Sequence, residues 1–288
     1  MSQSTGTGTD ERLIRNVSDT ALWVAIYRAH ETERPDALFR DPFARKLAGE
    51  RGEQIAKGLK SAQPEWPYAA RTVRFDQIVR SRLEQGADMV INLAAGLDTR
   101  PYRMDLPAKL QWVEVDLPDI TDYKERILAG EKPKCSLQRV RLDLADVPAR
   151  RKLFAELGSR ARNVLVMSEG LLVYLSREQV LELAADLAAQ PAFKDWGIDL
   201  CSPGLLEMLQ KNLKQLSEAG SPLKFAPPEG PEFFSPTGWK PVEVYSMLKT
   251  AAQLKRLPLF LRLFSLLPES NGRQGKRPWG GVCRLTRA

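Results

Sequence analysis

Apolar residues recur with two different periods along the chain, and the change of period divides it into parts. From Ser18 to Leu83 they recur every three or four positions, as in TALWVAIYRA and RTVRFDQIVRSRL, which predicts helices. Beyond this point short β-rich runs alternate with segments of helical composition; the runs are 88–94, 111–117, 137–144, 163–169 and 196–201. Strands that alternate with helices predict βαβ units and a mostly parallel sheet covered on both faces. The pattern therefore predicts a doubly wound α/β fold.

The chain after Cys201 has a looser pattern. Residues 203–220 predict a helix with leucines on one face, namely Leu205, Leu209, Leu213 and Leu216. The remaining expected elements are a strand at 238–246, a helix around 247–254 and a final strand at 280–287. The longest apolar stretch, 257–268, is shorter than the about 20 residues that a transmembrane helix needs, so we expect a core or lid helix there.

The composition is that of an ordinary globular protein, with 43% hydrophobic and 27% charged residues among 288. Residues 1–17 are polar and rich in glycine and threonine, which predicts a disordered tail. They show no basic region followed by an apolar one, so we expect no secretory signal. The three cysteines are far apart and form no C-x-x-C pair, which favours a reduced, cytoplasmic protein without a disulfide framework or a metal site.

The formal net charge of +7 raises the question of an anionic partner. The lysines and arginines are scattered and often neighbour acids, so we expect neither nucleic acid nor a membrane as a partner. The one histidine, His30, cannot build a metal site of several imidazoles by itself. A Ser-His-Asp hydrolase would have to use it, but the chain has no G-x-S-x-G motif.

The ends of the predicted strands carry the candidate chemistry, because doubly wound sheets bind ligands beyond the carboxyl ends of their strands. The first strand ends in Ala94, Ala95 and Gly96, whose small side chains let a ligand lie against the backbone. Asp116 ends the second strand, 20 residues after Gly96, which is the separation at which a carboxylate binds ribose hydroxyls. The alternative for Asp116 is a helix cap.

Acids also end the next two predicted strands. Asp143 could accept a hydrogen bond from an adenine amino group while Leu144 packs on the ring, and Glu169 ends the fourth strand. Each acid alone is equally well explained as an ordinary loop residue. Four successive strand ends with a bare turn or an acid favour a nucleoside ligand.

The turn after the first strand indicates which nucleoside. A dinucleotide site uses G-x-G-x-x-G to hold a pyrophosphate, whereas this turn is LAAGLDT and places Asp98 where phosphate charge would lie. A carboxylate there repels a phosphate and attracts a cation. S-adenosylmethionine carries a sulfonium and an ammonium and no phosphate, so it is the predicted cofactor.

Several long strings of the sequence resemble the leucine carboxyl methyltransferase superfamily, in particular its bacterial polyketide O-methyltransferase-like branch. They are TALWVAIYRAHETERPDALFRDPFA, ARTVRFDQIV, INLAAGLDTRPYRMDLP, SEGLLVYLSREQV and PWGGVCRLTR. The resemblance implies a class I methyltransferase with a seven-stranded sheet, an antiparallel last strand, N-terminal helices and a helical lid. It implies one domain over 18–288, divided into a helical cap (18–85), a cofactor-binding core (86–201), a lid (202–236) and the C-terminal strands and helix (237–288).

The resemblance also assigns roles to individual residues. Arg71 matches the arginine that pairs with the methionine carboxylate of S-adenosylmethionine, with a surface arginine as the alternative. The other matches are Gly96 for the cofactor glycine, Asp116 with the neighbouring Leu117 for the ribose acid, Asp143 and Leu144 for the adenine pair, and Glu169 near the methionine moiety. Ala94 departs from the family, because many relatives have glycine there.

The predicted function is O-methylation of a carboxylate or hydroxyl on a small organic molecule, such as a polyketide-like metabolite. A carboxylate acceptor needs little acid–base chemistry, whereas a hydroxyl acceptor benefits from a base. His30 is the one side chain whose ordinary pKa suits that role, and Tyr174 is a second candidate; a surface histidine and a core tyrosine are the alternatives. The alternative functions are a nicotinamide-dependent oxidoreductase, a protein carboxyl methyltransferase and a nucleic-acid-binding module.

Overall fold

β1 (Met89–Leu93) is an interior strand of the sheet in the computed structural model, and all five of its side chains are buried. Met89, Ile91 and Leu93 join one hydrophobic cluster, whereas Val90 joins another, because successive side chains point to opposite faces of a sheet. A strand with apolar residues on both faces needs cover on both sides. The structure describes residues 17–59, 64–218, 220–268 and 275–287.

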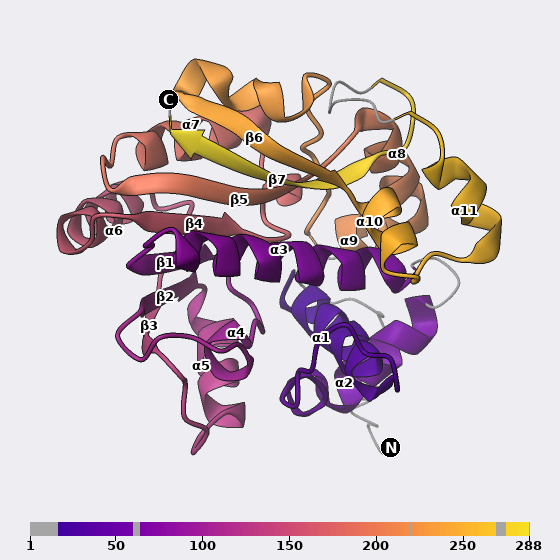
Figure 1. Ribbon diagram of the computed structural model, residues 1–288, viewed down its shortest axis with the longest axis horizontal. Helices are drawn as coiled ribbons and strands as arrows, with labels where there is room; N and C mark the ends of the chain where they lie inside the picture. The colour runs from indigo at the N-terminus through magenta and orange to yellow at the C-terminus, as the bar shows by residue number, and fades with distance from the viewer. Residues whose placement is uncertain (1–16, 60–63, 219, 269–274, 288) are drawn as a thin grey trace, which may run out of the picture.

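The sheet contains seven strands within these residues, in the order β3-β2-β1-β4-β5-β7-β6 (Figure 1). Besides β1 they are β2 (Gln111–Asp116), β3 (Ser136–Arg141), β4 (Val164–Ser168), β5 (Phe193–Cys201), β6 (Trp239–Ser246) and β7 (Gly280–Arg287). The first five pair in parallel, and β7 lies antiparallel between β5 and β6. The doubly wound sheet of seven strands with an antiparallel last strand is confirmed.

Helices cover both faces of this sheet (Figure 1). They are α1 (Val17–Glu33), α2 (Ala44–Leu59), α3 (Trp66–Glu84), α4 (Arg100–Arg103), α5 (Pro118–Ile127), α6 (Val147–Arg160), α7 (Arg177–Ala188), α8 (Pro203–Asn212), α9 (Lys214–Glu218), α10 (Met247–Gln253) and α11 (Leu259–Ser265). Two 3₁₀ helices are η1 (Leu172–Tyr174) and η2 (Gly230–Thr237). Side chains of α6, α7 and η2 pack in the cluster that contains Ile91, and Phe75, Ile78 and Val79 of α3 pack in the cluster that contains Val90.

The N-terminal helices form a separate layer beside the strand ends. α1 packs along α2 and also contacts α3, and Figure 1 shows α1 and α2 together below the long α3. Their apolar side chains, including Trp23, Ile26 and Leu47, form a cluster with Leu97 of the turn after β1. This layer is joined to the cofactor side of the sheet by Arg28, whose Nη2 donates to the carbonyl of Leu97 at 2.6 Å.

Some elements differ from the sequence-based expectation. The expected tail lies outside the described residues up to position 16, and α1 begins at Val17. β3 ends at Arg141, so Asp143 follows the strand and does not belong to it. The expected lid (202–236) ends in η2, where Phe234 is fully buried between strands and α7.

The apolar stretch at 257–268 forms α11; of the two expected alternatives the core helix is wrong, whereas the lid helix stays a prediction. Leu259, Phe260 and Leu263 are exposed there, whereas Leu257 is buried and Leu261 packs against the rest of the fold. None of the helices within the described residues has the length and apolar character that crossing a membrane requires.

Candidate active site

A cavity of about 940 Å³ lies at the carboxyl ends of the strands. It is lined on one side by the residues that follow β1 to β4 and by the end of β5, and on the other by α1, α8, α10 and α11. This is the edge at which doubly wound sheets bind ligands. The volume of the cavity lies near the upper end of the range of about 300–1,000 Å³ that ligand pockets have.

The turn after β1 holds the carboxylate of Asp116. The Gly96 N–H donates to Oδ2 of Asp116 at 2.6 Å, and the Leu117 N–H donates to Oδ1 at 2.8 Å. Gly96 has a φ of 50° and Ala94 a φ of 52°, both in the left-handed region that favours glycine. Burial raises the pKa of Asp116 although both N–H groups oppose the shift. Each carboxylate oxygen keeps a lone pair for a hydroxyl donor.

Asp143 and Leu144 lie beside this turn and line the same cavity. The Asp143 carboxylate is exposed, and its Oδ1 accepts a hydrogen bond from the Ala145 N–H at 2.9 Å. Leu144 is half-buried, and its carbonyl accepts from Nη1 of Arg150 at 2.8 Å. The structure thus brings together the turn at Gly96 and the two acids Asp116 and Asp143 in one cavity, as the sequence predicts.

Arg71 of α3 lies between two carboxylates at the ends of β4 and β5. Its Nε is 3.0 Å from Oε1 of Glu169, and its Nη1 donates to Oδ2 of Asp199 at 3.0 Å. The Gly170 N–H donates to the other Asp199 oxygen at 2.7 Å. Gly170 has a φ of 72°, and a Cβ there would lie 3.3 Å from Nη1 of Arg71, so both the backbone and the space favour glycine.

Asp98 lines the cavity, but it is not the free carboxylate that was expected to attract a cationic ligand. Its carboxylate accepts hydrogen bonds from Asn92 Nδ2 at 2.8 Å and from the N–H and Nη1 of Arg100, each at 3.0 Å. Burial alone would raise the pKa of Asp98, but the charges of Arg100, Lys124 and Arg103 together outweigh it and the pKa is lowered. Asp98 is ionised and already paired, so it is no free carboxylate that faces a ligand.

Arg100 connects Asp98 to the rest of the charged cluster. Its Nη1 is 2.9 Å from Oε2 of Glu169, and its Nε donates to Asp76 at 2.7 Å. Arg103 also donates to Asp76 and balances its charge. Three carboxylates remain, namely Asp98, Glu169 and Asp199, and they face the two guanidiniums of Arg71 and Arg100. When all five groups are ionised, one negative charge is in excess. This excess, rather than Asp98 alone, suits a cationic ligand.

The far side of the cavity is mainly apolar. Its walls include Trp23 and Val24 of α1, Leu205 and Leu209 of α8, and Phe225. Tyr174 also lines the cavity and is hydrogen-bonded to Thr20. Burial raises the pKa of Tyr174, so its hydroxyl stays protonated near neutral pH. It can therefore donate a hydrogen bond but is a weak candidate for a base.

The structure does not bring His30 to this site. His30 is absent from the described residues that line the cavity, and its Nδ1 lies 2.9 Å from Oε1 of Glu65. The hydrogen bond to Glu65 raises the pKa of His30 against the effect of its partial burial. His30 has no contact with the cavity through which it could remove a proton from a ligand, so we assign it no role as a general base.

Asp199 and Arg100 line the cavity and pair with predicted site residues, but they were not themselves predicted. Asp199 lies near the end of the predicted strand WGIDLC, so the rule that found Asp116 and Glu169 at strand ends also applies to it. Arg100 stands directly after the cofactor turn, but no local pattern shows that it pairs with Glu169. An acid at a strand end can be recognised in the sequence as a candidate site residue, whereas the residue that an arginine will pair with cannot.

The sheet order, the antiparallel β7 and the cavity at the strand ends define a class I methyltransferase fold. Two solved structures share it: a DUF574 family protein from Streptomyces avermitilis, with a TM-score of 0.53, and a provisionally named methyltransferase from Thermobifida fusca, with 0.52. The first is 15% identical to this chain, and the match covers 90% of this chain and 96% of that protein. The second is 16% identical, and the match covers 96% of this chain and 97% of that protein.

The family model described as leucine carboxyl methyltransferase matches residues 21–188, which is more than half of the chain. The chain belongs to the leucine carboxyl methyltransferase family. A relative from Streptomyces avermitilis is 34% identical over 240 residues, which cover 77% of this chain and 82% of the relative. A relative from a Parafrankia species is 39% identical over 189 residues, or 62% of this chain.

Both relatives bear the provisional name of S-adenosyl-L-methionine-dependent methyltransferase. The matched segment spans 60% of the length of the Parafrankia relative, and 63% of a similar relative from Mycobacteroides abscessus that is 35% identical. The chain thus spans less than two thirds of the length of these two relatives.

Proposed function

We propose that the protein transfers a methyl group from S-adenosylmethionine to an oxygen, of a carboxylate or a hydroxyl, on a small and largely apolar organic molecule. The observation that carries the proposal is the continuity of one cavity. It joins an acid-lined part at the strand ends to an apolar part beneath α1 and α8. A polyketide-like metabolite has the mixed character that the apolar part would accept.

The cofactor would occupy the acid-lined part, and the residues there suit its groups. Asp116 has acceptor positions for the ribose hydroxyls, Asp143 for the adenine amino group, and Leu117 and Leu144 supply apolar contacts. The bare backbone of Ala94 and Gly96 leaves room at the end of β1. Arg71 would meet the methionine carboxylate, while Glu169 and Asp199 would lie near the positive groups.

The bound cofactor supplies a methyl group on a positively charged sulfur, which an acceptor oxygen attacks in line. The chain itself would mainly align the acceptor and exclude water. The Tyr174 hydroxyl would donate a hydrogen bond to the acceptor and hold it in place. Neither histidine nor lysine occurs among the described residues that line the cavity, so an acceptor that is already ionised, such as a carboxylate, fits the site without a base.

The expected cap and lid can each be assigned to helices that border the cavity. We propose that α1 to α3 act as a cap on the cavity and that the segment from α8 to α9 acts as its lid, within one domain over 18–288. The three cysteines are free, and a reducing compartment such as the cytoplasm suits them.

The proposal is tested by calorimetric titration of the purified protein with S-adenosylhomocysteine and, separately, with NAD. Binding of the first and none of the second is expected. A screen for methyl transfer from labelled S-adenosylmethionine to apolar carboxylic acids, phenols and alcohols then identifies the acceptor class. Binding of NAD in place of S-adenosylhomocysteine would replace the proposal with an oxidoreductase, and transfer only to protein carboxyl groups would replace the small acceptor.

A further inference from the structure

The outer face of α11 and the residues after it form an exposed apolar surface, which we call the α11 patch. Its members are Leu259, Phe260, Leu263, Phe264, Leu266 and Leu267. Leu259 is 75% exposed and Leu266 is 80% exposed. Single exposed apolar residues are common, but a contiguous group of six marks a surface that binds something.

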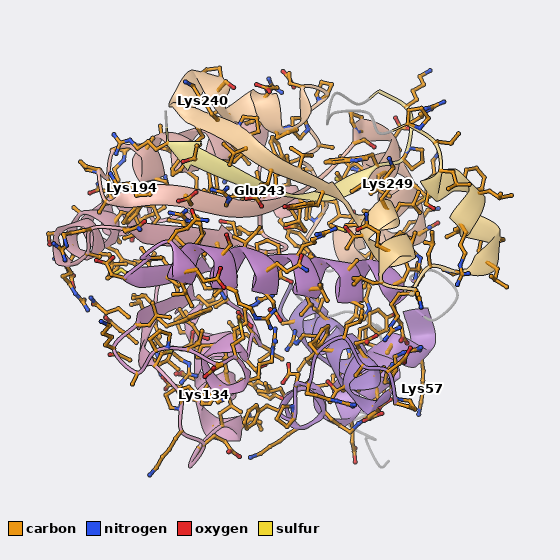
Figure 2. The ribbon with its side chains drawn as sticks, in the orientation of Figure 1. Lys57, Lys134, Lys194, Lys240, Glu243 and Lys249 are labelled. Carbon is orange, nitrogen blue, oxygen red and sulfur yellow. The ribbon has the colours of Figure 1, made fainter. Side chains whose placement is uncertain are left out.

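The charged residues next to the α11 patch along the chain are basic, and one of them, Arg256, is paired with Glu31 and Asp36. Lys255 precedes α11, Arg262 lies on it, and Lys276 and Arg277 follow in the chain; all four are exposed. The described residues 247–268 and 275–279 contain no acid. Figure 2 shows Lys249 on α10, the helix that contacts α11, whereas Lys194 and Lys240 lie at the opposite end of the sheet. An apolar surface with a basic surround is complementary to an anionic one.

The α11 patch also borders the opening of the cavity. Phe264 of α11 and Met208 of α8 line the cavity and are nevertheless 57% and 43% exposed, so they lie where it meets solvent. Leu261 of α11 lines the cavity from the inner side of the same helix. If α11 lies against another surface, a molecule that leaves that surface would therefore enter the cavity without crossing bulk water.

We infer that the α11 patch docks on the surface of a lipid bilayer that contains anionic lipids, with the apolar side chains inserted among the acyl chains and the basic residues at the headgroups. The apolar residues alone would suit a second copy of the chain. A two-fold interface, however, brings the same patch together with itself and would place Lys255, Arg262 and Lys276 of both copies in one interface. Anionic lipid neutralises these charges, and a second copy does not.

This docking reverses the sequence-based expectation that no membrane is a partner. That expectation rests on the scattered charges and on the length of the apolar stretch, which concerns only helices that would cross a bilayer. A helix that lies in the interface needs only one apolar face and basic neighbours. Delivery of an apolar acceptor from the bilayer into the cavity rests on the proposed function, whereas docking itself does not.

Docking is measured by sedimentation of the full chain with vesicles of phosphatidylcholine, either alone or mixed with phosphatidylglycerol, without cofactor or acceptor. We expect retention on the mixed vesicles that falls as salt is added. The double variant Leu259→Ser/Phe260→Ser should weaken it at least tenfold, because both side chains are exposed in the free protein and inserted in the bound state. Val242→Ser, at a residue of β6 that is 47% exposed, is the matched control and should change nothing.

The charge contribution has its own pair of variants. Lys255→Gln/Lys276→Gln should weaken retention on the mixed vesicles about 25-fold, at about fivefold per lysine. Lys194→Gln/Lys240→Gln removes two exposed lysines at the far end of the sheet and should leave retention unchanged. Thermal unfolding of each variant verifies that it is folded.

Three results would overturn the inference: no retention on the mixed vesicles, retention that both α11 variants leave intact, or self-association in analytical ultracentrifugation that Leu259→Ser/Phe260→Ser abolishes. The last result would assign the α11 patch to a second copy. Because the vesicle assay needs no methyl transfer, failure of docking and failure of the proposed activity are separate outcomes.

Discussion

Asp116 gives the sharpest test of the cofactor site. In the structure its two oxygens accept one hydrogen bond each from the N–H groups of Gly96 and Leu117, and each oxygen has a further acceptor position. Asp116→Ala removes the acceptors for both ribose hydroxyls and also the partner of the Gly96 N–H. The substitution should therefore weaken cofactor binding without loss of the fold.

The size of the effect follows from the charge of the acceptor. A hydrogen bond to a charged group contributes about 1.5–3 kcal/mol, so two of them contribute about 3–6 kcal/mol. Water can enter the emptied space at the cavity wall and compensate part of the loss, which places the expected value at the lower end. A loss of about 3 kcal/mol corresponds to a Kd about 150-fold higher.

The assay is calorimetric titration of S-adenosylhomocysteine into the wild type, Asp116→Ala and a matched control. Asp119→Ala is the control, because Asp119 is an exposed aspartate of the first turn of α5 and lies three positions away. The control should bind like the wild type. An Asp116→Ala protein that is folded by thermal unfolding and binds within about threefold of the wild type would refute the assignment of Asp116.

Four further outcomes are expected. Burial raises the pKa of Asp116, and its ionised form accepts the ribose hydroxyls. Affinity for S-adenosylhomocysteine should therefore fall on acidification, at a higher pH than it would with an aspartate of ordinary pKa. Calorimetric titrations of Asp116→Asn at several pH values should show no such dependence. Asp41→Ala strands the buried Arg28 guanidinium and should lower the free energy of unfolding by about 3–5 kcal/mol in denaturant melts, whereas Asp36→Ala, at an exposed carboxylate, should have far less effect. Ala94→Gly should raise stability by up to about 1 kcal/mol in the same melts, because it removes the left-handed strain at φ 52°; a loss of stability would contradict that reading of the turn. His30→Gln should leave the methyl-transfer rate within about twofold, and a loss of the rate with intact cofactor binding would show that His30 reaches the acceptor after all.

Much of the sheet could be predicted because each strand is a local pattern. β7 lies at 280–287, the range predicted for the final strand, and the other strand runs lie within a few residues of their predicted ends. The turn at Gly96 and the acid at Asp116 were recognisable for the same reason, since their separation along the chain is set by one βαβ unit.

The charged cluster could not be predicted in the same way. Arg71 and Asp199 are 128 residues apart, and their contact depends on how α3 crosses the sheet. The pairing of Asp98 with Arg100 is local, but a carboxylate and a neighbouring arginine in a sequence do not show whether they face each other or a ligand. The exposure of α11 is likewise a tertiary property, since its composition is equally that of a core helix.

The position of β7 has a consequence for the order in which the molecule forms. β7 separates β5 from β6, and Asp199 of β5 lies opposite Val282 in the register of the pair. A ribosome adds residues 280–287 after all the other strands, so during synthesis β5 is an open edge and β6 has no strand on its inner side. β5, which carries Asp199 to the cavity, therefore pairs with β4 alone until β7 has been made and has inserted.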